Sequence, residues 1–146
     1  MTFDDKTAAA QTETLSFEVD LGHAPEKVWR ALTDPALLEE WLLPVVGFAL
    51  EPEAAFTFQA PPQPGWDGVV SCRLLEVEPQ RKLRYTWVVD DMNTVVTFTL
   101  TPTASGTRLS ILQSGFEPHQ KRNFGGARYG WRMMGGKLVD LLARLP

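Results

Sequence analysis

Residues 131–145 read WRMMGGKLVDLLARL, and their pattern decides the fold. Large apolar residues recur in this stretch at steps of three and four, which places them on one stripe of an α-helix. They are Trp131, Met134, Leu138, Leu142 and Leu145, and Asp140 and Arg144 fall on the opposite side. Because such a stripe must be buried against another layer of structure, we predict a long C-terminal helix that packs on a sheet.

The preceding chain supplies that sheet. Residues 15–21 alternate apolar and polar side chains, which is the two-residue period of a strand with one buried face. Residues 46–113 read as further strands, separated by turn residues at 61–65, 78–80, 90–93 and 104–106. Hairpin links favour an antiparallel sheet. Within residues 69–77 either alternating set of side chains can face inward, so the register of this strand stays open.

Two short helices are expected between the first strand and the rest of the sheet. Pro25 and Pro35 each stand at a first helical position, and Asp34 is a residue type that caps helix N-termini. Both helices end before Pro44. The predicted architecture is an α+β fold of the helix-grip type, in which a curved antiparallel sheet wraps around the long helix and leaves a hollow between them.

The chain has the usual length of one domain, at 146 residues. Residues 1–13 show no apolar periodicity, so we expect a disordered N-terminal tail followed by a single domain over 14–146. The composition, 44% hydrophobic and 22% charged, is that of a globular protein.

Charge and hydropathy exclude several classes of function. No apolar run approaches the ~18 residues of a membrane span, and the N-terminus is polar, so we expect a cytoplasmic protein without membrane insertion. The net charge is −4, although six basic residues and one acid follow Glu117. We interpret the basic segment as a solvated helix face and expect no nucleic-acid partner.

Several short motifs follow one another in a specific order. They are APEKVWRALTDP at 24–35, Trp41 with Pro44, EVEP at 76–79, LRYTW at 83–87, GTRL at 106–109, SGF at 114–116 and Gly130-Trp131. This order resembles the activator of heat-shock protein 90 ATPase homologue family, within the START and birch-pollen-allergen (SRPBCC) superfamily. The likeness covers about residues 14–145. The chain departs from the family pattern at Leu42-Leu43 and at Ala54-Ala55, where a tryptophan and a glycine are common.

The resemblance implies a START-like helix-grip fold whose internal cavity holds lipids, polyketides or other hydrophobic molecules. It brings no universal catalytic residue, and the family name comes from a co-chaperone domain. A small hydrophobic ligand is therefore the expected partner, and a chaperone or another protein is the alternative.

Residues for catalysis or metal binding are few. His23 and His119 stand far apart in predicted loops, and Cys72 is the one cysteine. Without a cluster at ligand spacing we predict no metal and no cofactor. Cys72 is interpreted as a small buried residue rather than a nucleophile. A cyclase or hydrolase acting by orientation stays open, provided that Cys72, Tyr85 or Arg128 lies at the cavity.

The candidate ligand-binding residues are mostly aromatic. They are Trp41, Phe56, Phe58, Trp66, Trp87, Phe98, Arg128, Trp131, Met134 and Leu138. Most of these aromatic residues also suit a simple core. Trp66 follows a proline-rich loop that can cover the cavity, and Arg128 lies at the border of the apolar stripe, where it can contact a ligand's carboxylate or only the surface.

Glycines are concentrated in or just before the C-terminal helix. They are Gly125, Gly126, Gly130, Gly135 and Gly136. Each interior helix glycine costs ~1 kcal/mol relative to alanine, so something must offset the cost. Close packing, a kink and room for a ligand are the three explanations. We expect Gly130 to bring the helix backbone close to the sheet and Trp131 to be the pivot of the helix.

Overall fold

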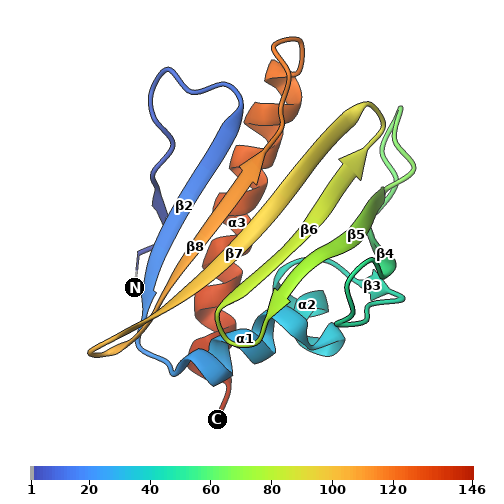
Figure 1. The fold of residues 1–146 in the computed structure, drawn as a ribbon. Coiled ribbons are helices and arrows are strands. Elements are labelled where there is room, and N and C mark those ends of the chain that lie inside the picture. The colour runs from blue at the N-terminus through green and yellow to red at the C-terminus, as the bar shows by residue number, and fades with distance from the viewer. Residues whose placement is uncertain (1) are drawn as a thin grey trace.

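The computed structural model describes residues 2–146 (Figure 1). The elements in chain order are β1 (Asp4–Asp5), β2 (Thr14–Leu21), α1 (Pro25–Thr33), α2 (Pro35–Trp41), β3 (Val45–Val46), β4 (Ala55–Gln59), β5 (Val69–Glu78), β6 (Lys82–Val89), β7 (Met92–Thr103), β8 (Gly106–Ser114) and α3 (Lys121–Arg144). None of the helices in this described part of the chain combines the length and the apolar character needed to cross a bilayer.

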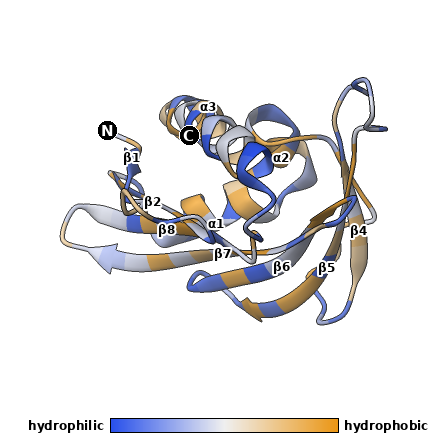
Figure 2. Cartoon of the chain, turned by 90° about the horizontal axis from the view of Figure 1, so that it is seen from above, coloured by the Kyte–Doolittle hydropathy of each residue, from blue (hydrophilic) through white to orange (hydrophobic). Residues whose placement is uncertain are grey.

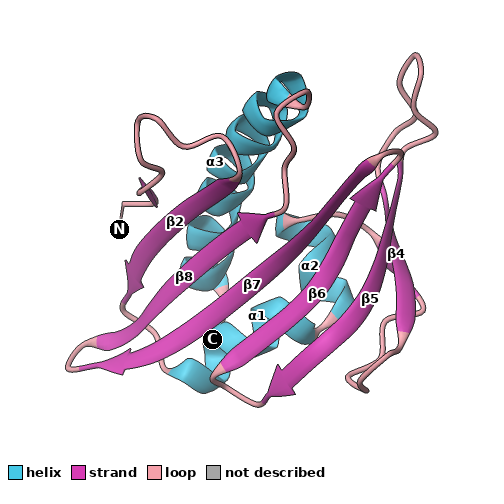
Figure 3. Ribbon diagram, turned by 45° about the horizontal axis from the view of Figure 1, so that its top comes forward, coloured by secondary structure: helices cyan, strands magenta, loops and turns pink. Residues whose placement is uncertain are grey.

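One antiparallel sheet contains all eight strands, in the order β1-β2-β8-β7-β6-β5-β4-β3. Hairpins join β5 to β8 in succession, and β2 closes onto β8. The helices lie on one face of the sheet, which curves around them (Figures 2 and 3). The helix-grip prediction is therefore confirmed.

The two short helices begin where their prolines predict. Asp34 caps α2, because its Oδ1 accepts a hydrogen bond of 2.9 Å from the Ala36 amide. Trp41 at the end of α2 donates from Nε1 to the Ala31 carbonyl at 2.8 Å, which joins α2 to α1. Both helices lie beside the C-terminal end of α3, where Lys27 binds the Leu145 carbonyl and Arg144 pairs with Glu40 (Figure 1).

Strand β5 explains why its register could not be read from the sequence. Val70, Cys72 and Leu74 face the interior, and the pairing with β6 shifts between Leu74 and Glu76. After this irregularity every residue is half-buried. A β-bulge breaks the two-residue period, so neither alternating set describes the whole strand.

Helix α3 is longer than its apolar stripe predicts. It starts at Lys121, ten residues before Trp131, and ends at Arg144, so Leu145 lies just beyond it. Trp131, Leu138 and Leu142 are buried as expected, whereas Met134 is half-buried.

The segment before β2 differs from the expected tail. Asp4 and Asp5 pair with Glu18 and Phe17, and the ring of Phe3 stacks on that of Phe17 at 5.3 Å. We call residues 3–7 the N-terminal strap. Its contacts are made with distant parts of the chain, which is why local periodicity does not reveal them. Met1, also assigned to the tail, lies outside the described residues.

Candidate functional site

A hollow of about 400 Å³ lies between the sheet and the N-terminal half of α3. Strands β6, β7 and β8 provide its floor and α3 its opposite wall, and the loop between β4 and β5 reaches its rim. It is lined by Trp66, Trp87, Met92, Gln113, Asn123, Gly126, Ala127, Gly130, Trp131 and Met134. In Figure 1 this end of α3 lies away from α1 and α2, which fill the other end of the interior.

The glycines of α3 leave part of this space open. A Cβ added to Gly126 would meet no atom within 4 Å, and one added to Gly130 would meet only the Met134 Cε at 3.8 Å. The expected close approach of Gly130 to the sheet is therefore wrong. Gly135 behaves differently, because a Cβ there would overlap the ring of Phe3. Close packing explains Gly135, and open space surrounds Gly126 and Gly130.

Aromatic rings form the inner wall of the hollow. The rings of Trp87 and Trp131 lie 5.8 Å apart and tilted by 46°, and Trp131 meets Phe98 edge to face at 6.1 Å. Behind them Tyr85 contacts Phe98, at 5.8 Å, and Phe58, at 6.0 Å. These rings fill the interior beneath the hollow, and among them only Trp87 and Trp131 line it.

A chain of hydrogen bonds crosses the floor of the hollow. The Trp131 Nε1 donates to the Gln113 Oε1 at 2.7 Å, and the Gln113 Nε2 donates to the Thr94 Oγ1 at 3.0 Å. The Thr94 hydroxyl in turn donates to the Trp87 carbonyl at 2.7 Å. Gln113 is only 1% exposed, so these bonds satisfy polar groups whose burial would otherwise be costly.

Two contacts shape the rim. Trp66 and Gln63 exchange two backbone hydrogen bonds of 2.9 Å, and the Trp66 Nε1 donates to the Val69 carbonyl at 3.1 Å, so the loop itself holds this indole in place. Across the hollow the Gln120 Nε2 donates to the Asp91 carbonyl at 3.0 Å. This bond ties the start of α3 to the turn between β6 and β7.

The predicted ligand-binding residues divide into two groups. Trp66, Trp87, Trp131 and Met134 line the hollow. The other six do not, and they are Trp41, Phe56, Phe58, Phe98, Leu138 and Arg128. The first five of these six are buried core residues.

Arg128 does not line the hollow, and its half-buried side chain lies at the surface of α3. Its Nε binds the Asp5 Oδ2 at 2.5 Å, and the Arg132 Nη2 binds the same oxygen at 2.7 Å. The guanidinium of Arg128 therefore forms an ion pair with the Asp5 carboxylate of the strap.

Six lining residues were missed from the sequence: Met92, Gln113, Asn123, Gly126, Ala127 and Gly130. Gln113 carried a usable signal, because it occupies an inward position of β8 after the apolar Leu109 and Ile111. A polar residue at such a position indicates a buried network or a binding site. Gly126 and Gly130 belong to the helix glycines for which room for a ligand was one explanation, whereas Met92, Asn123 and Ala127 carry no comparable local signal.

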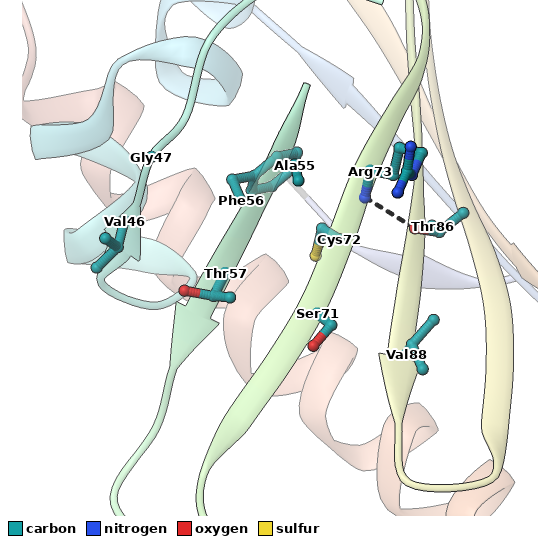
Figure 4. A pocket seen from close by; sticks show the side chains of 10 residues that line it. All are labelled: Val46, Gly47, Ala55, Phe56, Thr57, Ser71, Cys72, Arg73, Thr86 and Val88. Carbon is teal, nitrogen blue, oxygen red and sulfur yellow. Dashed lines mark hydrogen bonds between the residues drawn. The ribbon is translucent and has the colours of Figure 1, made fainter. Parts of the chain in front are cut away.

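A second and more open depression lies on the outer face of β4, β5 and β6, with a volume of about 590 Å³ (Figure 4). Its lining includes the short polar side chains of Thr57, Ser71 and Thr86. Arg73 at its edge pairs with Glu53 at 3.6 Å, and its backbone amide donates to the Thr86 Oγ1 at 2.8 Å. Although it is larger, this depression would leave an apolar ligand widely exposed to water.

The titratable residues considered for catalysis lie away from the hollow. Burial raises the pKa of the Cys72 thiol to about 12, which keeps it protonated, and burial also raises the pKa of Tyr85 well above its ordinary value. Burial, followed by the charge of Lys27, lowers the pKa of His23. Cys72, Tyr85 and Arg128 do not line the hollow, so the enzyme hypothesis loses the residues on which it depended.

Comparison with known proteins shows a matching family and similar solved structures. The profile of the family described as Activator of Hsp90 ATPase homolog 1-like protein matches residues 23–143. Protein MLL2253 from Mesorhizobium loti is 45% identical, with a TM-score of 0.84 over 91% of this chain and 98% of that one. Protein CV1439 from Chromobacterium violaceum is 29% identical, with a TM-score of 0.73 over 90% and 98%.

A more distant likeness extends to the fold alone. CalU16 from Micromonospora echinospora is 21% identical, with a TM-score of 0.74 over 98% of this chain and 85% of that one. No curated protein matches the chain.

Proposed function

The chain belongs to the family of Activator of Hsp90 ATPase homolog 1-like proteins, and from that premise we propose that it binds a small hydrophobic molecule in the hollow beside α3. The carrying observation is the lining of the hollow, which includes three tryptophans and two methionines but no titratable side chain. Its volume of about 400 Å³ lies within the ~300–1,000 Å³ of pockets that hold small molecules. The molecule is bound without chemical conversion.

The glycines of α3 support this proposal. Gly126 and Gly130 each cost the helix ~1 kcal/mol relative to alanine, yet neither allows a close backbone contact that would offset the cost. Both line the hollow, so their missing side chains enlarge it. A ligand that removes the apolar walls from water provides the compensating free energy.

Two neighbouring glycines allow a direct test. Gly126 lines the hollow and Gly125 does not, although an added Cβ meets no atom within 4 Å at either position. Leucine at position 126 therefore fills the hollow, and leucine at position 125 adds the same bulk outside it. Binding of 2-acetylnaphthalene is measured by tryptophan fluorescence and by amide shifts at Trp87 and Trp131.

Gly126→Leu is expected to weaken binding at least tenfold, which corresponds to about 1.4 kcal/mol, while Gly125→Leu keeps the wild-type affinity. Equal affinities in the two variants would place the ligand elsewhere and overturn the proposal. Extraction of the purified wild-type protein into organic solvent, followed by mass spectrometry, is expected to release a hydrophobic compound that Gly126→Leu retains in smaller amount.

A further inference from the structure

The chemistry of the ligand can be read from the floor of the hollow, and this step rests on the proposed function. Gln113 is the one buried polar side chain among the lining residues. The direction of its amide follows from its partners. An indole N–H only donates, so the oxygen of Gln113 must face Trp131 and its nitrogen must face Thr94.

This arrangement leaves one hydrogen-bond donor of Gln113 without a partner among the residues that the structure describes. The Thr94 hydroxyl gives its hydrogen to the Trp87 carbonyl, so it accepts from Gln113 and cannot donate back. The amide nitrogen of Gln113 carries two hydrogens, and only one of them finds an acceptor within residues 2–146. This second donor belongs to a buried side chain that lines the hollow, and a buried donor without a hydrogen bond is costly.

None of the residues that line the hollow in the described part of the chain carries a charge that could pair with an ion. Arg128 would be the nearest cation in the sequence pattern, but Asp5 holds its guanidinium at the strap. A carboxylate or an ammonium group entering the hollow would lose its hydration without gaining a charged partner. An uncharged ligand avoids that cost.

The walls add a preference for shape. Two tilted indoles and the side chains of Met92 and Met134 line the hollow together with Gln113. Flat rings pack well against indole faces, and thioethers make favourable contacts with ring edges.

We infer that the hollow selects an uncharged, flat ligand that carries a hydrogen-bond acceptor, such as a ring-bound ketone or quinone oxygen, and that the Gln113 Nε2 donates to this acceptor. Gln113 is thus a specificity-determining residue. The Gln113 donor favours ligands that carry an acceptor, and the lack of a counter-charge disfavours acids of the same size.

Three probes with the same ring system separate these effects. 2-Acetylnaphthalene has a ketone, 2-ethylnaphthalene has nearly the same shape without an acceptor, and 2-naphthoate carries a charge. Tryptophan fluorescence titrations of the wild-type protein at pH 7 are expected to rank the ketone first. A single added hydrogen bond corresponds to a preference of roughly 2- to 10-fold over the ethyl compound. The carboxylate is expected to bind at least about tenfold more weakly than the ketone.

Two variants connect the preference to Gln113. Gln113→Met keeps the length of the side chain without donors and is expected to remove the preference for the ketone over the ethyl compound. Gln59→Met makes the same exchange at an exposed position of β4 that does not line the hollow, and it keeps the preference. Thermal unfolding of each variant checks that it is folded, and the wild-type ranking provides a test that needs no variant.

The outcomes distinguish the inference from the proposed function. Equal binding of ketone and ethyl compounds to the wild-type protein, or tighter binding of the carboxylate, would overturn the selectivity while leaving the hollow as a binding site. A ketone preference that survives in Gln113→Met, or one that is also lost in Gln59→Met, would show that Gln113 is not the donor. If none of the three probes perturbs the fluorescence or the amide shifts of Trp87 and Trp131, the proposed function fails as well.

Discussion

Helix α3 has two sides that face the rest of the molecule, and they are built in opposite ways. Toward the sheet, Gly126 and Gly130 border a hollow, and an added methyl group would find open space. Toward the N-terminus, Gly135 is covered by the ring of Phe3, and an added methyl group would overlap it. Glycine thus leaves open space on one side of α3 and allows close packing on the other.

The closed side is held by charge as well as by packing. Asp5 accepts from both Arg128 and Arg132, which are one helical turn apart on α3. On the open side, Gln113 joins Trp131 to the sheet at the floor, and Gln120 ties the start of α3 to the Asp91 carbonyl at the rim. The difference indicates that contacts with the strap help to hold α3 in position, while the hollow on its other side is left without close packing.

The largest effect is expected at the residue that belongs to both the core and the hollow. Trp131 is only 1% exposed, so Trp131→Ala should lower the free energy of unfolding by about 3 to 5 kcal/mol through lost burial and a new cavity. Urea denaturation measures this loss. Trp66→Ala is the matched control, because this half-buried rim residue should affect probe binding more than stability. Equal losses of stability in the two variants would contradict the division between core and rim.

The packing of Phe3 on Gly135 predicts that substitutions at these two positions affect stability in a coupled way. Gly135→Ala should destabilise the protein by about 1 to 3 kcal/mol, because the new Cβ displaces the ring of Phe3. In a Phe3→Ala background the same change should be neutral or stabilising, since alanine is the better helix former. A double-mutant cycle measured by urea denaturation reports this coupling. Additive effects would show that Phe3 does not cover Gly135 in solution.

The charge of the strap predicts a dependence on pH. Burial alone would raise the pKa of Asp5, but hydrogen bonds from Arg128, Thr7 and Arg132 outweigh it and hold this pKa well below its usual range. The ion pair therefore stabilises the fold above the unfolded pKa of about 3.9 and loses this contribution as the pH falls toward the folded pKa.

Asp5→Asn should cost about 1 kcal/mol at pH 7, a value between those of exposed and of buried charged hydrogen bonds. The difference from the wild type should shrink below about pH 4. Urea denaturation between pH 7 and pH 3 measures it, with Asp4→Asn, an exposed neighbour, as control. A difference that stays constant with pH would exclude the ion pair as its source.

The smallest effects come from alanine at the open glycines. Gly125→Ala, Gly126→Ala and Gly130→Ala should each stabilise the protein by about 0.4 to 1 kcal/mol, since none meets a close contact. Only the changes at 126 and 130 should weaken probe binding, because only these two residues line the hollow. Thermal unfolding and fluorescence titration of the three variants give both quantities. Weaker binding in Gly125→Ala would show that the ligand contacts the outer side of α3, which would contradict the assigned site.

Local patterns were sufficient for the architecture. The three- and four-residue spacing from Trp131 to Leu142 predicts the buried stripe of α3, and the alternation over residues 15–21 predicts β2. Pro25 and Pro35 mark the starts of α1 and α2. These signals are readable because helix and strand periods relate residues only a few positions apart.

The tertiary structure decided which of these residues border the hollow. Arg128 meets Asp5 across 123 positions of sequence, and no period within α3 indicates that it turns to the strap instead of a ligand. The role of each glycine likewise depends on what the fold places opposite it, which is a phenylalanine ring at Gly135 and open space at Gly126. Gln113 acquires its orientation only when Trp131 and Thr94 arrive from α3 and β7. The sequence determines periods and caps because they arise from neighbouring residues, whereas space and hydrogen-bond direction arise from segments that meet only after folding.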